Sequence, residues 1–277
     1  MPPSLAVMRI TTHSGIWAVL TDPRFVVPPV PDDGPPATMR WLRAHVARFS
    51  SGEDHRRRRA QAAGALASLD GIALRRDAAR RTATRWEGED DTEAVVAGTL
   101  AAAFGLTVDV ADIVAAARAY HPQVEASPEV DQAVARLVDA FGGRADEAAA
   151  ARVGLLMQGT LPTAGLVENA MRELRGRPCS AESTDATLAE TLHHDPPVRV
   201  TRRLATAPAR IGGADVPPGV VVELDLATGN QDPAVLVDRF AFGAGEHACP
   251  GAAYAQAIAA GIIDELAARA GGRSSDP

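Results

Sequence analysis

The sequence predicts a mainly α-helical fold with small β-sheets, the α+β class, and three observations support that prediction. Apolar residues recur at helical spacing through most of the 277 residues. Alternating apolar and polar residues, typical of short strands, are concentrated in residues 198–205 and 209–226. Clusters of proline and glycine separate these segments, and a composition that is 46% hydrophobic and 23% charged is typical of a globular protein.

Breakers and caps place the helices. A short helix over residues 16–22 ends before Pro23, and residues 26–36 are extended because consecutive prolines exclude a helix. Asp109 opens a later helix and Ser127 is a typical N-cap for the next. The remaining helices are expected at 38–49, 53–69, 92–104, 109–121, 128–141, 145–174, 187–194 and 251–270. Residues 271–277 are expected to form a flexible tail.

Charge and composition argue against several classes of protein. The net charge of −7 disfavours nucleic-acid binding. No apolar run is long enough to span a bilayer and no secretory leader opens the chain, so a cytoplasmic protein without a membrane partner is expected. Two cysteines cannot form a disulfide framework, and Cys179 is expected to be an incidental loop residue. Asp32, Asp33, Asp90 and Asp91 are expected to be solvated loop acids.

The stretch FAFGAGEHACPG places Cys249 in a glycine-rich turn directly ahead of the last predicted helix. The free N–H groups and the dipole at a helix start favour an anion, and therefore a thiolate. Gly243 and Gly245 let the turn curl, while His247 and Phe242 flank the sulfur. Three sites remain open: a zinc site, which needs more ligands, a Cys–His nucleophile, and a thiolate ligand of haem iron.

The same stretch resembles the haem-binding signature of the cytochromes P-450, Phe-x-x-Gly-x-His/Arg-x-Cys-x-Gly. The five defined positions are present as Phe242, Gly245, His247, Cys249 and Gly251. The resemblance implies heme b (iron protoporphyrin IX) as cofactor, with Cys249 as the axial metal ligand. It also implies a shortened cytochrome P-450-like fold, with residues 1–277 forming a single haem domain.

The resemblance extends to basic residues elsewhere in the chain. His55 and Arg59 match the family's His-x-x-x-Arg helix, whose side chains hold a haem propionate, and Arg203 stands where another propionate-binding arginine is common. Cations suit these positions because the propionates are carboxylates. Arg56 and Arg58 are expected on a solvated face of the same helix.

Three departures from the family pattern concern length, the Glu-x-x-Arg pair and the distal helix. The chain is short, so the N-terminal sheet strands are expected to be missing, and the distal lid and the meander before the cysteine to be trimmed. In this chain the pair is replaced by Glu190 and His193. The replacement implies a weaker, pH-dependent contact between the two side chains or, alternatively, that His193 is an ordinary buried histidine.

The distal helix contains the candidate catalytic residues Thr160, Leu161, Pro162 and Thr163. Leu161 stands at the place of the family's acid and Pro162 at that of its alcohol, and neither can deliver a proton. Pro162 is expected to free the carbonyl of Gln158, kink the helix and open a groove over the haem. The two threonines either relay protons or bond back to helix carbonyls.

The function implied by the resemblance is that of a compact bacterial haem-thiolate oxidoreductase, a monooxygenase or a peroxide-using enzyme. Its expected substrate is a small or carrier-bound intermediate of secondary metabolism. Expected partners are a ferredoxin or reductase, and a second copy of the chain that would cover a pocket left open by the missing lid. Two alternatives stay open: a haem-dependent isomerase, dehydratase or N–O-cleaving enzyme without external oxidant, and a non-catalytic partner protein.

Overall fold

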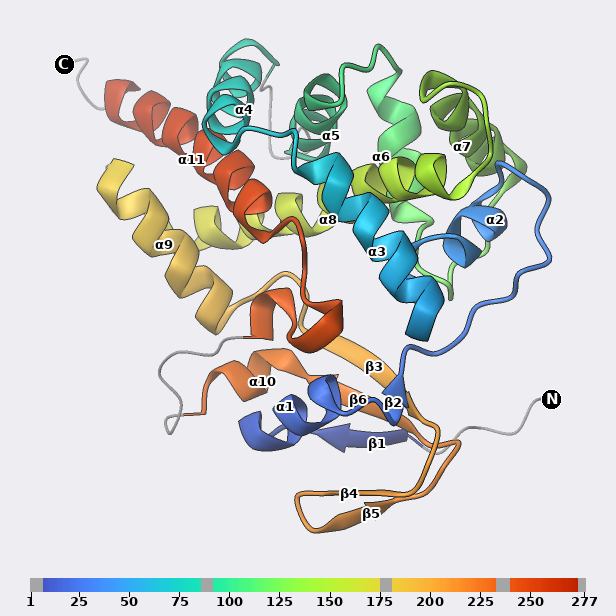
Figure 1. The fold of residues 1–277 in the computed structure, drawn as a ribbon. Coiled ribbons are helices and arrows are strands. Elements are labelled where there is room, and N and C mark those ends of the chain that lie inside the picture. The colour runs from blue at the N-terminus through green and yellow to red at the C-terminus, as the bar shows by residue number, and fades with distance from the viewer. Residues whose placement is uncertain (1–6, 86–91, 175–180, 233–239, 274–277) are drawn as a thin grey trace. The chain divides into compact units, whose positions relative to one another are not determined.

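The computed structural model describes residues 7–85, 92–174, 181–232 and 240–273 (Figure 1). The chain divides into two compact units. We call residues Met1–Pro29 with Leu192–Cys249 the sheet unit, and Val30–Thr191 with Pro250–Pro277 the helical unit. The predicted class, mainly helical with small sheets, is confirmed. That both units form one haem domain stays a prediction.

The sheet unit contains a four-stranded sheet in the order β1-β6-β3-β2, with β1 parallel to β6 and the other pairs antiparallel. Its strands are β1 (Val7–Ile10), β2 (Phe25–Val26), β3 (Val200–Ala205) and β6 (Val221–Asp225). The expectation that the N-terminal strands are missing is therefore wrong, because β1 and β2 form the two edges. Four and two residues long, they have little pattern of their own, and their partners lie about 180 residues or more away in the sequence.

Short helices and a hairpin complete the sheet unit. The smaller elements are α1 (His13–Thr21), β4 (Ala209–Ile211), β5 (Ala214–Val216), α10 (Leu226–Asn230), and the 3-10 turns η3 (Phe240–Phe242) and η4 (Gly245–His247). Their core contains Ile16, Val19, Phe25, Leu224 and Phe240, each at most 5% exposed. The segment 209–226, expected to form short strands, ends instead at the start of α10, where the Asp225 side chain caps the helix.

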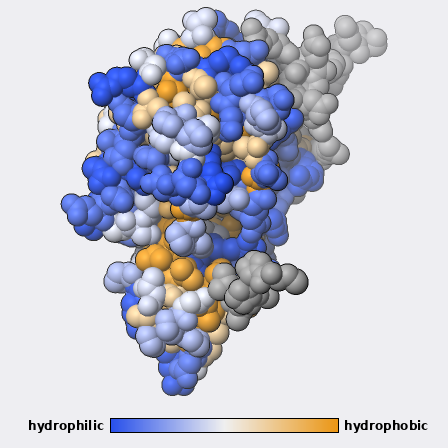
Figure 2. Space-filling view, turned by 90° about the vertical axis from the view of Figure 1, so that its right-hand side faces the viewer, coloured by the Kyte–Doolittle hydropathy of each residue, from blue (hydrophilic) through white to orange (hydrophobic). Residues whose placement is uncertain are grey.

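The helical unit is an assembly of helices around α8. Its elements are α2 (Met39–Ala44), the 3-10 turn η1 (Ala47–Phe49), α3 (Gly52–Leu66), α4 (Gly71–Arg85), α5 (Thr92–Ala103), α6 (Val110–Arg118), α7 (Pro128–Ala140), α8 (Glu147–Leu174), α9 (Ala181–His194) and α11 (Ala252–Arg273). Helix α9 continues into the sheet unit after Thr191. Helix α8 contacts α2, α3, α5, α6, α7 and α11. On the face shown in Figure 2, hydrophilic residues cover most of this unit.

Most predicted helices are present, with some changed boundaries. Asp109 and Ser127 cap α6 and α7 as expected, each accepting from a backbone N–H in the first turn. The helix expected over 38–49 is interrupted after Ala44. Helix α4 was not predicted from the sequence. It is rich in arginine, and only a few apolar residues mark its buried face.

The last helix, α11, extends to Arg273, three residues into the expected tail. It lies against α4, where Gly261 meets the backbone of Arg75 so closely that a Cβ atom has no room. Within the described parts of the chain, no helix combines the length and apolarity needed to cross a bilayer.

Candidate functional site

The loop that carries Cys249 is held by its own backbone. The Cys249 N–H donates to the Phe242 carbonyl at 2.8 Å, and the Gly243 N–H donates to the Phe240 carbonyl at 2.8 Å. The side chain of Cys249 is exposed. Helix α11 begins at Ala252, which confirms the expected position of the cysteine between a glycine-rich loop and a helix.

Two glycines give the loop its shape. Gly243 and Gly245 have φ values of 71° and 67°, in the left-handed region that favours glycine. A Cβ atom on Gly245 would lie 2.5 Å from the carbonyl oxygen of Leu20, at the end of α1. The loop therefore packs directly on the backbone of α1, and only glycine fits there.

Asn230 is a positioning residue that the sequence analysis missed. This buried side chain accepts from the Phe240 N–H at 2.6 Å and donates to the Leu192 carbonyl at 3.2 Å. It thereby joins α10 to the start of the cysteine loop and to the end of α9. A single asparagine in a segment for which no helix or strand was predicted gives no sequence signal of this role.

The residue types in the Cys249 loop are suited to binding haem. The exposed thiol belongs to a loop whose conformation is fixed by backbone bonds and glycine contacts, so the sulfur is held in a defined position. A thiolate is a ligand that haem iron accepts. His247 is half-buried beside it in sequence, with its Nε2 3.6 Å from a carboxylate oxygen of Glu246. Phe242 and Gly251 are also half-buried.

The expected propionate-binding residues lie on two elements. Arg203 is buried on β3, where its guanidinium donates to the Thr201 hydroxyl at 3.2 Å and to the Arg202 carbonyl at 2.8 Å. His55 is buried on α3, and Arg59, one turn later, is half-buried. Their roles toward a propionate stay predictions.

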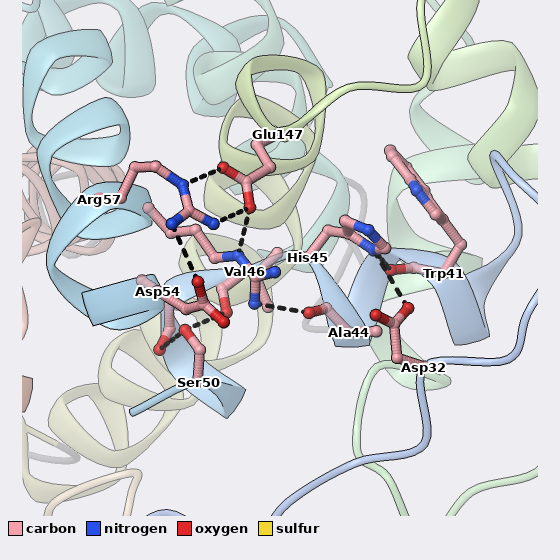
Figure 3. A network of polar contacts seen from close by, with 11 residues as sticks. Asp32, Trp41, Ala44, His45, Val46, Ser50, Asp54, Arg57 and Glu147 are labelled. Atoms are coloured by element: carbon pink, nitrogen blue, oxygen red, sulfur yellow. Dashed lines mark hydrogen bonds and ion pairs between the residues drawn. The ribbon is translucent and has the colours of Figure 1, made fainter. Parts of the chain in front are cut away.

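Two further arginines of α3 clamp the start of α8 (Figure 3). Arg57 donates twice to the Glu147 carboxylate, at 2.8 and 2.7 Å, and Arg58 donates to it at 2.8 Å. Arg58 also donates to the Ala44 carbonyl at 2.6 Å. Arg56 is exposed as expected, but the expectation of a solvated Arg58 is wrong, because both its partners lie on the covered side of α3.

The clamp shifts the titration of its carboxylate. The hydrogen bonds from Arg57, and then those from Arg58, lower the pKa of Glu147 to about 2 against the opposing effect of partial burial. The loop acids Asp32 and Asp33 are exposed as expected, and they also pair with His45 at 3.8 Å and with Arg40 at 2.5 Å.

Helix α8 places the four distal candidates on different sides. Thr160 is fully buried and donates to the Leu156 carbonyl at 2.8 Å, which is the back-bonding alternative for this residue. Thr163 is 2% exposed. Leu161 and Pro162 are half-buried, and the helix continues through Pro162. The catalytic roles of these residues stay predictions.

The remaining site expectations concern the Glu-x-x-His pair and the second cysteine. Glu190 is exposed on α9, and His193 is half-buried with its ring 4.3 Å from that of His194. Cys179, Asp90 and Asp91 lie outside the described residues.

Comparisons with known proteins bear on both fold and sequence. No family model matches the chain. A protein named "Putative cytochrome P450 140" from Mycobacterium bovis is 34% identical over an alignment of 123 positions, and the match covers 37% of this chain and 28% of that protein. The match thus spans less than a third of this relative.

Solved structures match over nearly the whole chain. P450BioI in complex with a hexadec-9Z-enoic acid ligated acyl carrier protein has a TM-score of 0.74 at 20% identity, covering 94% of this chain and 84% of that one. CxnD, a cytochrome P450 enzyme for C–S bond formation in chuangxinmycin biosynthesis, has a TM-score of 0.73 at 17% identity, covering 96% and 81%. At these identities the likeness shows the fold.

Proposed function

Because the chain has the fold of the cytochromes P450 and resembles that family in sequence, we propose that it is a haem-thiolate oxidoreductase. One observation carries the proposal: Cys249 is exposed in a loop whose conformation requires glycine at position 245. A scaffold without cofactor has no use for a thiol presented in this way.

The residues that the resemblance assigns to the cofactor would hold heme b. The thiolate of Cys249 would bind the haem iron. His55, Arg59, His247 and Arg203 would provide hydrogen bonds and positive charge for the propionates. When bound, haem supplies redox chemistry toward dioxygen or peroxide, and the thiolate increases electron density at the iron.

The proton supply favours peroxide as the oxidant. Leu161 and Pro162 have no exchangeable side-chain proton, and Thr160 is fully buried with its hydroxyl bonded within the helix. Dioxygen chemistry needs a proton donor at the reacting oxygen, whereas hydrogen peroxide arrives already reduced and protonated. The same observation favours, as a second candidate, a rearrangement or dehydration that uses no external oxidant.

The substrate class is proposed from the neighbours. P450BioI was solved with an acyl carrier protein, and CxnD acts in the biosynthesis of chuangxinmycin. We therefore propose a small or carrier-bound biosynthetic intermediate as substrate. If dioxygen is the oxidant, a ferredoxin or reductase supplies the electrons.

The reduced, carbon monoxide-bound spectrum of the haem-loaded chain tests the proposal. The wild-type protein and Cys179→Ser should both show a strongly red-shifted Soret band, and Cys249→Ser should lose it completely. A colourless wild-type protein would instead support a non-catalytic partner protein. An unchanged spectrum in Cys249→Ser would refute thiolate ligation.

Turnover with peroxide alone, compared with turnover using dioxygen and a reductase, then separates the two oxidants.

A further inference from the structure

One side of α8 remains partly accessible although six helices pack around it. Between residues 154 and 166 the half-buried residues are Leu155, Gln158, Gly159, Leu161, Pro162 and Gly165. Gly159 faces α5, because a Cβ atom there would lie 2.8 Å from the Leu100 Cδ1 atom. The other five recur at helical spacing and form one face, which we call the α8 stripe.

The hydroxyls expected on the distal side lie away from this stripe. At about 100° per residue, Thr160 lies roughly 200° and Thr163 roughly 140° around the helix from Gln158. Both threonines are at most 2% exposed. A ligand on the α8 stripe would therefore not meet either hydroxyl.

Gln158 is the polar side chain of the α8 stripe. Its Nε2 donates to the Gly154 carbonyl, one turn earlier, at 3.0 Å. This contact orients the carboxamide along the helix and makes Oε1 the acceptor that the side chain offers to a ligand. The neighbours on the stripe, Leu155, Leu161 and Pro162, are apolar.

Pro162 adds a second acceptor at the same residue. Proline has no N–H, so the carbonyl of Gln158, four residues earlier, has no donor from position 162 in the helix. A helix carbonyl that lacks this bond is satisfied by water, by a side chain or by a ligand. Gln158 thus brings a side-chain oxygen and a backbone oxygen to an otherwise apolar stripe.

We propose that Gln158 is a specificity-determining residue that accepts a hydrogen bond from an N–H or O–H group of an otherwise apolar substrate. The inference deepens the proposed function and rests on it. A net hydrogen bond of this kind contributes about a five- to tenfold preference for the ligand that carries the donor. A substrate of the same shape without the donor leaves the acceptor desolvated and unpaired.

Indole and indene test the proposal because they share one bicyclic frame and differ by the N–H donor of indole. The dissociation constant of each is measured by equilibrium dialysis against the haem-loaded full chain. Gln158→Met should reduce the preference for indole about five- to tenfold relative to wild type. Gln158→Glu keeps an acceptor oxygen and should retain the preference, which a merely structural role would not explain.

Gln256 provides the matched control. It is half-buried on α11 and donates to the Ala252 carbonyl at 3.2 Å, the same contact one turn back. Gln256→Met should leave the preference unchanged. Pro162→Ala restores an N–H to the Gln158 carbonyl and should reduce the preference while raising helix stability, so it decides the question if Gln158→Met does not fold.

The outcomes separate the two proposals. Wild-type preference in Gln158→Met, or no measurable binding of indole to the wild-type chain, would overturn the role of Gln158. Loss of the thiolate spectrum from the wild-type chain would overturn the proposed function instead. Each variant is therefore checked for its carbon monoxide spectrum before the dialysis.

Discussion

The Cys249 loop carries the proposed iron ligand, and helix α8 carries the proposed substrate contact. The sequence specifies the two regions in different ways. In the loop, Gly243 and Gly245 have positive φ values, which favour glycine at these two positions. In α8, every residue has the same backbone conformation, so only its position around the helix distinguishes it. A motif in a loop therefore predicts the backbone geometry of that loop. A motif in a helix predicts the role of a residue only when the neighbouring helices, which decide what each face contacts, are known.

The two regions also differ in what holds them. The loop rests on the backbone of α1 through Gly245 and on the amide of Asn230. Helix α8 is fixed at its start by the ion pairs of Glu147 with Arg57 and Arg58. Substitutions in the loop should therefore destabilise the protein by steric clash. Substitutions at the start of α8 should destabilise it by removing charge interactions.

The largest effect is expected from Gly245→Ala. The alanine combines a φ of 67° with a Cβ atom 2.5 Å from the Leu20 carbonyl, a backbone atom that cannot move aside. Backbone strain and overpacking together should cost about 3 kcal/mol of unfolding free energy and weaken haem binding. Urea unfolding and haem titration measure the two effects.

Gly212→Ala is the control for this substitution, since Gly212 has a φ of 58° and nothing within 4 Å of a Cβ atom. It should cost about 1 kcal/mol and leave haem affinity unchanged. Equal losses in both variants would show that the contact with α1 does not hold the loop.

An intermediate effect is expected from Glu147→Gln. The pKa of Glu147 is lowered to about 2, so its ionised form stabilises the fold above its ordinary pKa of 4.5. This contribution is lost as the pH falls from 4.5 toward 2. The variant should lose ~1–2 kcal/mol at pH 7, discounted for partial solvation.

Urea unfolding of both proteins at pH 7 and at low pH measures the effect. The difference between wild type and Glu147→Gln should shrink at low pH. The exposed Glu53 provides the control, because Glu53→Gln should change the unfolding free energy little at either pH. A difference that stays constant with pH would contradict the clamp.

The smallest effect is expected from Thr160→Val, which tests whether the Thr160 hydroxyl on α8 takes part in proton transfer. The hydroxyl bonds to its own helix, so turnover should stay near wild type and stability should change by about 1 kcal/mol or less. Thr99→Val on α5 is matched, because Thr99 is buried and donates to the Val95 carbonyl at 2.8 Å. A selective drop in turnover of about 10²-fold for Thr160→Val would reveal a proton relay.

Particular residues show how far the sequence could predict this molecule. The caps Asp109 and Ser127 were predictable because a cap bonds to a backbone N–H two or three residues away. The burial of Arg58 was not, because its partner Glu147 lies 89 residues away. Strand β1 was missed for the same reason, since its pairing with β6 joins Val7 to Val221.

The sequence alone predicted the loop of Cys249, because glycine conformations and backbone turns are decided within a few residues. Haem as its proposed ligand follows from the resemblance of that stretch to the cytochrome P-450 signature. Only the tertiary structure decided that Gln158, rather than Thr160, lies on the partly accessible face of α8. That choice depends on α5 covering one side of the helix and on α3 anchoring its start, and both contacts join residues far apart in the chain.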